Sequence, residues 1–373
     1  MVVVNGADPV PDGHVLEAGT DYEARLIEGY DLTRFTDLYD DLYRRSAPTA
    51  YVWPRISFDA DAHVLASRVE LTLDDLATEV EQRILETCLE FDLLEPEPEA
   101  DCGVLVGLSG GVDSTALLLA LTANADRLPA HRIVAATFED FDSQKSTVQA
   151  RAKQLASDCG IPHITVGADR AQNAFHLSCP LSEALTGLME TADAHKVMYI
   201  DHHTTRRVLE VVAVEEGLDR IALGLHVSDL VAGLLNSWFT GYDVAPVPRR
   251  RIGDLTYIYP LAFINKKQLH LYYRQRTGGF ATHAHPNAWE LHPQDRNFYY
   301  YLADVMQQYW PGLEVFLYSA HRWRGRRQAP LVEEHCVNCG STLLHQPFTP
   351  VDSDWCDVCQ IFERHGYIDR EAL

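Results

Sequence analysis

One short segment restricts the possible folds of this chain more than any other. The apolar run at residues 104–108 is followed by Ser109-Gly110-Gly111-Val112-Asp113-Ser114, and then by a second apolar run at residues 115–121. This order predicts a buried strand, a tight glycine turn and a helix. Two adjacent glycines let the backbone turn where a side chain would clash, and the helix presents the positive end of its dipole to the turn. The segment is therefore a predicted phosphate-binding site.

The polar groups of the turn suit a bound polyphosphate. Main-chain amides can face the anion at Gly110, Gly111 and Val112. Hydroxyl groups can donate hydrogen bonds to phosphate oxygens from Ser109, Ser114 and Thr115. Asp113 is negatively charged, so we expect it to reach phosphate through Mg²⁺. The Walker pattern GxxxxGK[ST] does not occur in the sequence, and the remaining alternative is an ordinary strand–helix turn capped by serine or aspartate.

Strand-like and helix-like segments alternate along the chain. Predicted helices cover residues 71–94, 146–159 and 205–216. Predicted strands, besides the one before the glycine turn, cover residues 132–138, 163–166, 220–224 and 257–261. This alternation predicts an α/β fold with a doubly wound parallel sheet. A ligand of such a sheet binds at the carboxyl ends of the strands, where the glycine turn lies.

Composition divides the chain into three predicted parts. Residues 1–101 hold 24 of the 54 acidic residues and 7 of the 31 basic ones, in a chain of net charge -23. Residues 1–66 are predicted to be an acidic N-terminal extension that serves as a docking surface or an oligomer contact, so a homodimer stays open. Residues 67–320 are expected to form the nucleotide-binding domain, and residues 321–373 a C-terminal module.

The sequence also bears on partners and location. Basic clusters suit either a solvated surface or contact with nucleic acid, and they lie at residues 206–207, 249–251 and 321–327. No apolar run is long enough to span a bilayer, and the first residues lack a signal-peptide pattern. We therefore expect a cytoplasmic protein with no membrane partner. Eight cysteines in such a chain favour metal sites or buried thiols over disulfides.

Four of the cysteines have the spacing of a metal site. Cys336, Cys339, Cys356 and Cys359 form the pattern C-x2-C-x16-C-x2-C, which supplies four thiolates for a tetrahedral ion. Gly340 after the first pair permits the tight turn of a cysteine knuckle. The pattern predicts a zinc ribbon with structural Zn²⁺. The alternatives are a redox pair or an iron–sulfur site, and an iron–sulfur cluster is not expected.

The strand, the SGGVDS turn and the helix together resemble the PP-loop, or N-type, ATP pyrophosphatase superfamily. Between residues 70 and 366 the chain resembles the branch that makes 2-thiouridine and 2-thiocytidine in tRNA. Five places carry this resemblance: the helix from Leu71 into the glycine turn, Arg206-Arg207 at the head of a helix, the stretch from Ile221 to Asp229, Tyr259-Pro260-Leu261, and the two cysteine pairs. The resemblance implies a fold like that of the adenine nucleotide alpha hydrolases.

The resemblance also implies an activity and roles for individual residues. ATP would adenylate a carbonyl oxygen and release pyrophosphate, and a sulfur nucleophile would then displace AMP. The implied partners are tRNA and a sulfur carrier. Asp113, helped by Asp229, would hold Mg²⁺, and Arg206 or Arg207 would neutralise charge or position the acceptor. The remaining nucleotide-binding positions would be Thr137 and Phe138 beside adenine, together with Gly224 and His226.

The chain departs from the thiolation branch at the sulfur-handling positions. Aligned on the arginine pair, the CxxC positions of the family hold Tyr199 and His202, and its later Cys-Pro is His285-Pro286. Leu225 and Ser228 replace a histidine and an aspartate of the family. Either sulfur arrives by another route or the nucleophile is not sulfur.

Several functional alternatives therefore stay open. The acceptor can be a tRNA base, or a small-molecule or protein carbonyl attacked by nitrogen, and the protein can instead be a nucleotide-binding scaffold that has lost catalysis. Asp201, His202, His203 and His285 can form a substitute metal site or simply line a nucleotide cleft. Cys159 and Cys179 can carry sulfur or be ordinary buried thiols.

Overall fold

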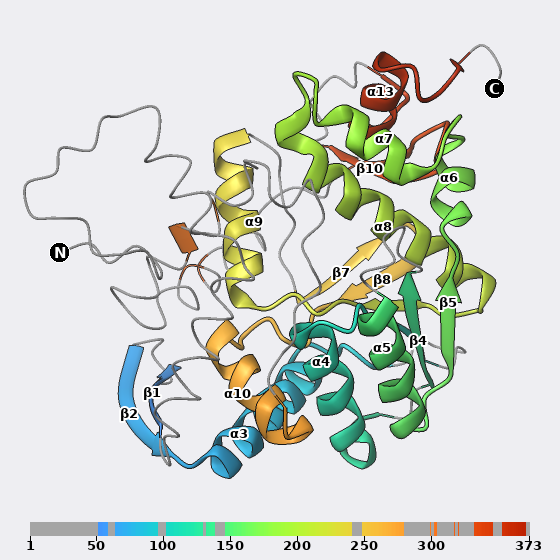
Figure 1. The fold of residues 1–373 in the computed structure, drawn as a ribbon. Helices are drawn as coiled ribbons and strands as arrows, with labels where there is room; N and C mark the ends of the chain where they lie inside the picture. Colours follow the sequence, from blue (N-terminus) through green and yellow to red (C-terminus); the bar gives the residue numbers. More distant parts are fainter. Residues whose placement is uncertain are drawn as a thin grey trace, which may run out of the picture.

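The structure is a computed structural model, shown in Figure 1. The residues that it describes are 51–58, 64–95, 102–129, 132–138, 146–240, 248–279, 332–345 and 353–370, with a few single positions between 299 and 320. The first 50 residues of the predicted N-terminal extension lie outside these ranges, as do His285 and the basic cluster at 321–327.

The centre of the fold is a six-stranded sheet with the strand order β5-β4-β3-β6-β8-β7. Neighbouring strands are parallel except at one edge, where β7 runs antiparallel to β8. The strands are β3 (Gly103–Gly107), β4 (Arg132–Phe138), β5 (His163–Val166), β6 (Arg220–Ala222), β7 (Arg249–Ile252) and β8 (Leu255–Ile258). The predicted α/β fold with a parallel sheet is confirmed, and the antiparallel edge strand β7 is a feature that the sequence reading did not include.

Helices cover both faces of this sheet. Strand β3 shows why, because its residues alternate between two cores: Leu105 packs into one, whereas Val104 and Val106 pack into the other. The core with Val104 takes residues from α3 (Leu73–Glu90), α4 (Val112–Ala123), α5 (Ser146–Asp158) and α10 (Lys266–Thr277). The core with Leu105 takes residues from α6 (Asp169–Phe175), α7 (Leu181–Leu188), α8 (Val197–Glu215) and α9 (Val227–Thr240).

Helix α8 begins earlier than the sequence reading placed it. The helix was expected at residues 205–216, whereas it starts at Val197. Val197, Met198 and Ile200 are buried and supply the first turn of its apolar face. The expectation that Arg206-Arg207 stands at the head of a helix is therefore wrong: the pair lies in the middle of α8, away from the positive end of its dipole.

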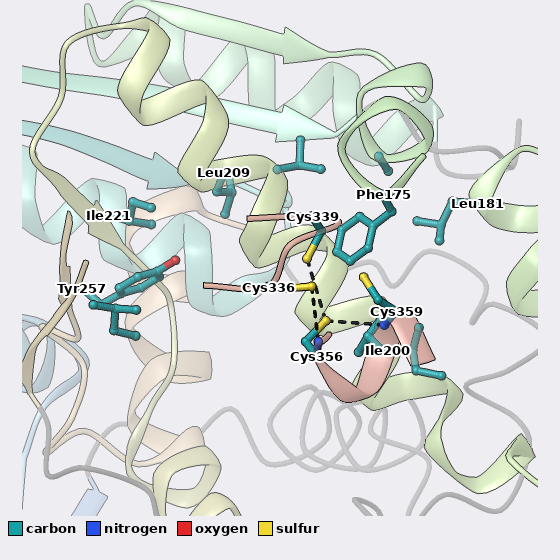
Figure 2. Packing of buried hydrophobic residues seen from close by; sticks show 14 of the residues in the cluster. Phe175, Leu181, Ile200, Leu209, Ile221, Tyr257, Cys336, Cys339, Cys356 and Cys359 are labelled. Atoms are coloured by element: carbon teal, nitrogen blue, oxygen red, sulfur yellow. Dashed lines mark hydrogen bonds between the residues drawn. The ribbon is translucent and has the colours of Figure 1, made fainter. Parts of the chain in front are cut away.

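The C-terminal cysteine module packs against the main domain. Its antiparallel strands β9 (Val332–His335) and β10 (Thr342–His345) precede helix α13 (Asp357–Arg364), which lies beside α6 and α7 in Figure 1. The four cysteines share a buried core with Phe175, Ile200 and other residues of the main domain (Figure 2). Ser178 N donates to Tyr367 O at 2.9 Å and closes the tail onto the α6–α7 connection.

The remaining regular elements are short. An antiparallel pair, β1 (Tyr51–Phe58) and β2 (Val64–Leu71), precedes α3. Residue 66, the predicted end of the N-terminal extension, lies within β2. Single 3-10 turns, η1 (Ala125–Arg127) and η3 (Ala194–Lys196), follow α4 and precede α8. Within the described ranges, no helix combines the length and the apolar character that crossing a bilayer requires.

Candidate functional site

The glycine turn joins β3 to α4 at the carboxyl end of the central strand. Gly110 has φ +79°, a backbone conformation that residues with a Cβ rarely adopt. Gly111 is the N-cap of α4, and no side chain caps the amides of the first turn there. Ser109 and Gly111 are exposed whereas Val112 is buried, so the turn presents main-chain amides to solvent from a fixed base. This is the geometry of an anion site at a helix N-terminus.

Two serine side chains brace the turn from within. Ser109 Oγ accepts from Gly111 N at 3.3 Å and lies 3.0 Å from Ser114 Oγ. Ser114 Oγ in turn donates to Gly111 O at 3.3 Å. The hydroxyls that the sequence assigned to phosphate are thus within hydrogen-bond distance of each other. Thr115, the third of these residues, is buried at 6% exposure in the first turn of α4.

Gly224, after β6, packs directly against the start of α4. A Cβ at Gly224 would lie 2.9 Å from Ser114 N and 3.0 Å from the carbonyl carbon of Asp113. Both are backbone atoms, so they cannot move aside as a flexible side chain would. The sequence predicted that Gly224 binds nucleotide. In the structure its visible role is to let the β6 loop approach the glycine turn.

Thr137, at the end of β4, holds the residue that precedes the turn. Its hydroxyl donates to Leu108 O at 2.6 Å, and its oxygen lies 2.8 Å from His163 Nε2. Thr137 is buried at 3% exposure. Burial and the nearby Lys153 charge lower the pKa of His163 below the usual imidazole value, which favours a neutral ring that donates from Nε2 to the threonine. Phe138 follows Thr137 and is anchored through its carbonyl by Gln149 Nε2 at 2.9 Å.

His226 and Asp229 organise the start of α9. His226 N donates to Asp229 Oδ2 at 2.9 Å, and Ser228 N donates to His226 Nδ1 at 3.2 Å. His226 Nε2 lies 3.5 Å from the same Asp229 oxygen. Because Nδ1 accepts a hydrogen bond, the ring proton belongs on Nε2, which faces the carboxylate. The buried His226 and the partly buried Asp229 form one hydrogen-bonded unit at the helix N-terminus.

Lys266 of α10 contacts the residue that follows the glycine turn, a contact that the sequence did not predict. Its Nζ lies 2.9 and 2.7 Å from the two carboxylate oxygens of Asp113. Asn265 caps α10 through a capping box with Gln268 and makes Lys266 the first residue of that helix. The asparagine cap just after Tyr259-Pro260-Leu261 was the available sequence signal for a helix start. No local pattern could have paired this lysine with a residue 153 positions away.

The two predicted catalytic arginines are engaged around Glu210. Arg207 Nη1 donates to Glu210 Oε2 at 3.1 Å, and Arg206 Nε lies 3.6 Å from Glu210 Oε1. The hydroxyl of Tyr257, on β8, donates to Glu210 Oε1 at 2.5 Å. Burial and the Glu210 charge raise the pKa of Tyr257 well above that of an ordinary phenol, so it remains a donor. The guanidinium of Arg207 also reaches the cysteine module, where its Nε donates to Cys339 O at 2.5 Å.

The four cysteines have the geometry of a site for a single metal ion. Their sulfur atoms all lie within 4.8 Å of one another, and Cys339 Sγ is 3.8 Å from Cys356 Sγ. A tetrahedral zinc with Zn–S bonds of about 2.3 Å places its sulfurs about 3.8 Å apart. The donor set therefore fits a divalent, thiophilic ion.

The other residues considered for sulfur or metal chemistry do not converge. Within the described parts of the chain, the cysteine group is the only cluster of three or more potential metal ligands. Tyr199 is 45% exposed on α8, and His203 is buried and bonded to the cysteine module. Burial raises the pKa of both Cys159 and Cys179, which is opposite to the shift that activates a thiol.

Comparison with known proteins finds a similar fold among solved structures. The sequence matches no family model and no curated protein sequence. Among solved structures, a U34-tRNA thiolase, NcsA from Methanococcus maripaludis with its [4Fe-4S] cluster, aligns with a TM-score of 0.59 and 18% identity, over 80% of this chain and 91% of that chain. NAD+ synthetase from Burkholderia pseudomallei aligns over 67% of this chain and 92% of that chain with a TM-score of 0.34 and 16% identity, too weak a match to support an argument. The thiolase match shows that this chain shares the fold of that protein.

Proposed function

We propose that this protein is an ATP-dependent adenylating enzyme that splits ATP into AMP and pyrophosphate. The observation that carries the proposal is the exposed, uncapped glycine turn at the head of α4, with Asp113 and Lys266 beside it. Main-chain amides there would bind the pyrophosphate portion of ATP, because fixed dipoles stabilise phosphate charge without rearrangement. The shared fold with a tRNA thiolase supports this assignment.

Asp113 and Lys266 would divide the handling of charge. The Asp113 carboxylate suits Mg²⁺, which accepts one or two carboxylates together with phosphate oxygens. When Asp113 takes that role, the Lys266 ammonium is released next to the phosphates and can neutralise the leaving pyrophosphate. Asp229 stays paired with His226 and would help from the start of α9. Thr137 would shape the adenine side indirectly, by holding Leu108.

For the acceptor, we propose a tRNA base, with sulfur as the replacing nucleophile. The thiolase fold supports this choice. Tyr199 and His202 stand where the thiolation family has cysteines, so the sulfur would come from an external carrier. A carbonyl attacked by nitrogen is the second candidate, and the exposed Tyr199 favours it because a tyrosine can hold neither a cluster nor a persulfide.

The cysteine module would hold structural Zn²⁺. Four thiolates around one ion leave no open position for substrate, so the site would stabilise the fold and not take part in the chemistry. Thiolates on the separate irons of a cluster stand farther apart than thiolates on a single ion, and the 3.8 Å sulfur spacing here favours the single ion. Metal analysis of the purified protein distinguishes zinc from iron.

A direct assay tests the proposal. Purified protein is incubated with Mg²⁺ and ATP, with and without unmodified tRNA, and AMP and pyrophosphate are measured. We expect acceptor-dependent release of both, and a Ser109→Ala, Asp113→Ala double variant that is slower by at least two orders of magnitude, on the scale of removing electrostatic stabilisation of a transition state. Equal AMP release by the variant would contradict the assignment. Tight ATP binding without turnover with any acceptor would favour the scaffold.

A further inference from the structure

A metal ion bound by the four cysteines would leave a net negative charge buried between the cysteine module and the main domain. Four thiolates around a divalent ion carry a net charge of -2, and the four cysteines are at most 6% exposed. Burying a net charge is costly unless hydrogen-bond donors and opposite charges surround it. The groups around the sulfurs therefore decide how tightly the site can hold a metal.

In the described part of the chain, three of the sulfurs accept a hydrogen bond, and the fourth, Cys339 Sγ, lies next to a hydroxyl. Two donors are main-chain amides of the module itself: Cys356 N donates to Cys336 Sγ at 3.2 Å, and Cys359 N donates to Cys356 Sγ at 3.4 Å. The third is the side chain of Asn338, which donates to Cys359 Sγ at 3.2 Å. At the fourth sulfur, Cys339 Sγ donates as a thiol to Ser341 Oγ at 3.1 Å; as a metal-bound thiolate it carries no proton and would instead accept from that hydroxyl. Three of these groups belong to the module alone or link it to α6, but the fourth depends on α8.

His203 of α8 orients the Ser341 hydroxyl. His203 Nε2 lies 3.2 Å from Ser341 Oγ, while its Nδ1 lies 3.5 Å from Arg206 Nη2. An arginine only donates, so Nδ1 is the acceptor and Nε2 carries the proton. Nε2 then donates to Ser341 Oγ, and the hydroxyl proton is left to point at Cys339 Sγ. This series of contacts turns a serine into a donor for the thiolate.

Arg207 fixes the same knuckle from the other side. Its Nε donates to Cys339 O, and Gly340, at φ +70°, approaches so closely that a Cβ there would lie 2.7 Å from Arg207 Nη2. The guanidinium therefore places a positive charge against the knuckle. Arg207 is held in turn by Glu210, which Tyr257 ties to strand β8. Arg207 has the same partner carboxylate as Arg206.

We propose that Arg207 and His203 are positioning residues for the metal centre, and that metal loading of the cysteine module is coupled through them to the middle of α8. Loading fixes the knuckle at residues 336–340, the knuckle fixes Arg207 and His203, and these two fix Arg206 and Glu210. The arginine pair is thus part of the docking surface between module and domain. Metal affinity is in this way a property of the main domain as well as of the four cysteines.

The test measures zinc release from the intact protein. Zinc-loaded wild type, Arg207→Ala and His203→Ala are mixed with a chromogenic chelator, and the zinc dissociation constant is determined by competition. We expect both variants to bind zinc on the order of 10–100-fold more weakly, the usual effect of removing a group that orients a ligand. Arg170→Ala is the matched control, because Arg170 of α6 pairs at 2.7 Å with Glu215 at the end of α8, the helix that also carries Arg207. Wild-type affinity in both variants would overturn the proposal.

A spectroscopic readout covers the case in which an alanine variant does not fold. Cobalt-substituted Ser341→Ala loses only the hydroxyl between His203 and Cys339, and we expect its thiolate-to-cobalt absorption to shift from that of the wild type. Removing zinc from wild type should also speed amide exchange in residues 203–210 of α8 but not in α4. An unshifted spectrum together with unchanged exchange in α8 would overturn the proposal. None of these measurements involves ATP, so they do not depend on the proposed catalytic function.

Discussion

Lys266 and Asp113 form an ion pair in which one ammonium bridges both carboxylate oxygens, at 2.9 and 2.7 Å. The pair joins the first turn of α10 to the first turn of α4, and both side chains are partly exposed, at 15% and 26%. Each charge of the pair therefore has an opposite charge within hydrogen-bond distance. Under the proposed function, Mg²⁺ would take the place of the lysine beside Asp113 when ATP binds.

Replacing Lys266 should weaken nucleotide binding more than folding. Lys266→Met removes a charge-assisted contact to phosphate, which contributes about 1.5–3 kcal/mol, so we expect ATP to bind roughly 10–100-fold more weakly by calorimetry in the presence of Mg²⁺. Lys196→Met is the control, because Lys196 also pairs with an aspartate, Asp193 at 3.5 Å, but stands before α8. If the two variants bind ATP equally well, Lys266 has no role at the phosphates.

Gly224→Ala should displace the glycine turn. Its Cβ would stand 2.9 Å from Ser114 N, so either the β6 loop or the head of α4 must shift, at a typical overpacking cost of about 1–3 kcal/mol. We expect a lower midpoint in urea unfolding and a loss of ATP binding. Gly233→Ala is the control: among the described residues, no atom beyond its own helix backbone lies within 4 Å of a Cβ built there, and alanine should stabilise α9 by up to about 1 kcal/mol. Equal effects of the two changes would contradict this account of Gly224.

Thr137→Val should destabilise the protein and leave the shape of the strand intact. Valine keeps the volume but leaves the buried Leu108 carbonyl without its donor, which costs about 1–3 kcal/mol. Urea unfolding measures this loss directly. Thr122→Val is a matched control, because the Thr122 hydroxyl donates to Leu118 O within its own helix. We expect a weakened ATP affinity only for Thr137→Val, since only Leu108 adjoins the turn.

The buried thiol of Cys88 should make stability fall at high pH. Burial raises its pKa from 9.0 to about 12, so the folded state keeps the thiol protonated after the unfolded state has begun to ionise. This contribution to stability is complete below pH 9 and decreases by about 1.4 kcal/mol per pH unit up to about 12. The stability advantage of wild type over Cys88→Ala should therefore shrink between pH 8 and pH 10.5 in urea unfolding. A constant difference would show that Cys88 ionises in the folded protein as it does in the unfolded chain.

The parts of the fold that depend on local signals could be predicted from the sequence. The apolar run, Gly110-Gly111 and the following helix lie within one stretch, and the cysteine spacing carries its own geometry, so the strand–turn–helix unit and the four-cysteine group could be predicted. The parallel sheet followed from the alternation of strands and helices.

The rest depends on contacts between distant residues. Arg207 meets Cys339 132 positions later, and Lys266 meets Asp113 153 positions earlier. Such pairings follow from how helices pack on the sheet, and no local pattern records them. The predicted start of α8 was too late because residues 201–205 are polar and hide the helical periodicity. The first turn of the helix is nevertheless held by Val197 and Ile200, which are buried. Family resemblance placed Arg207 in catalysis, whereas its observed partners are Glu210 and the main-chain carbonyl of Cys339.

A structure of the protein crystallised with Mg²⁺ and a non-hydrolysable ATP analogue tests the central claim most directly. The account predicts the triphosphate on the amides of residues 110–112, with Asp113 turned toward the metal and Lys266 moved from the carboxylate to a phosphate oxygen. An analogue bound elsewhere, with the turn vacant and the Lys266–Asp113 pair intact, would contradict it.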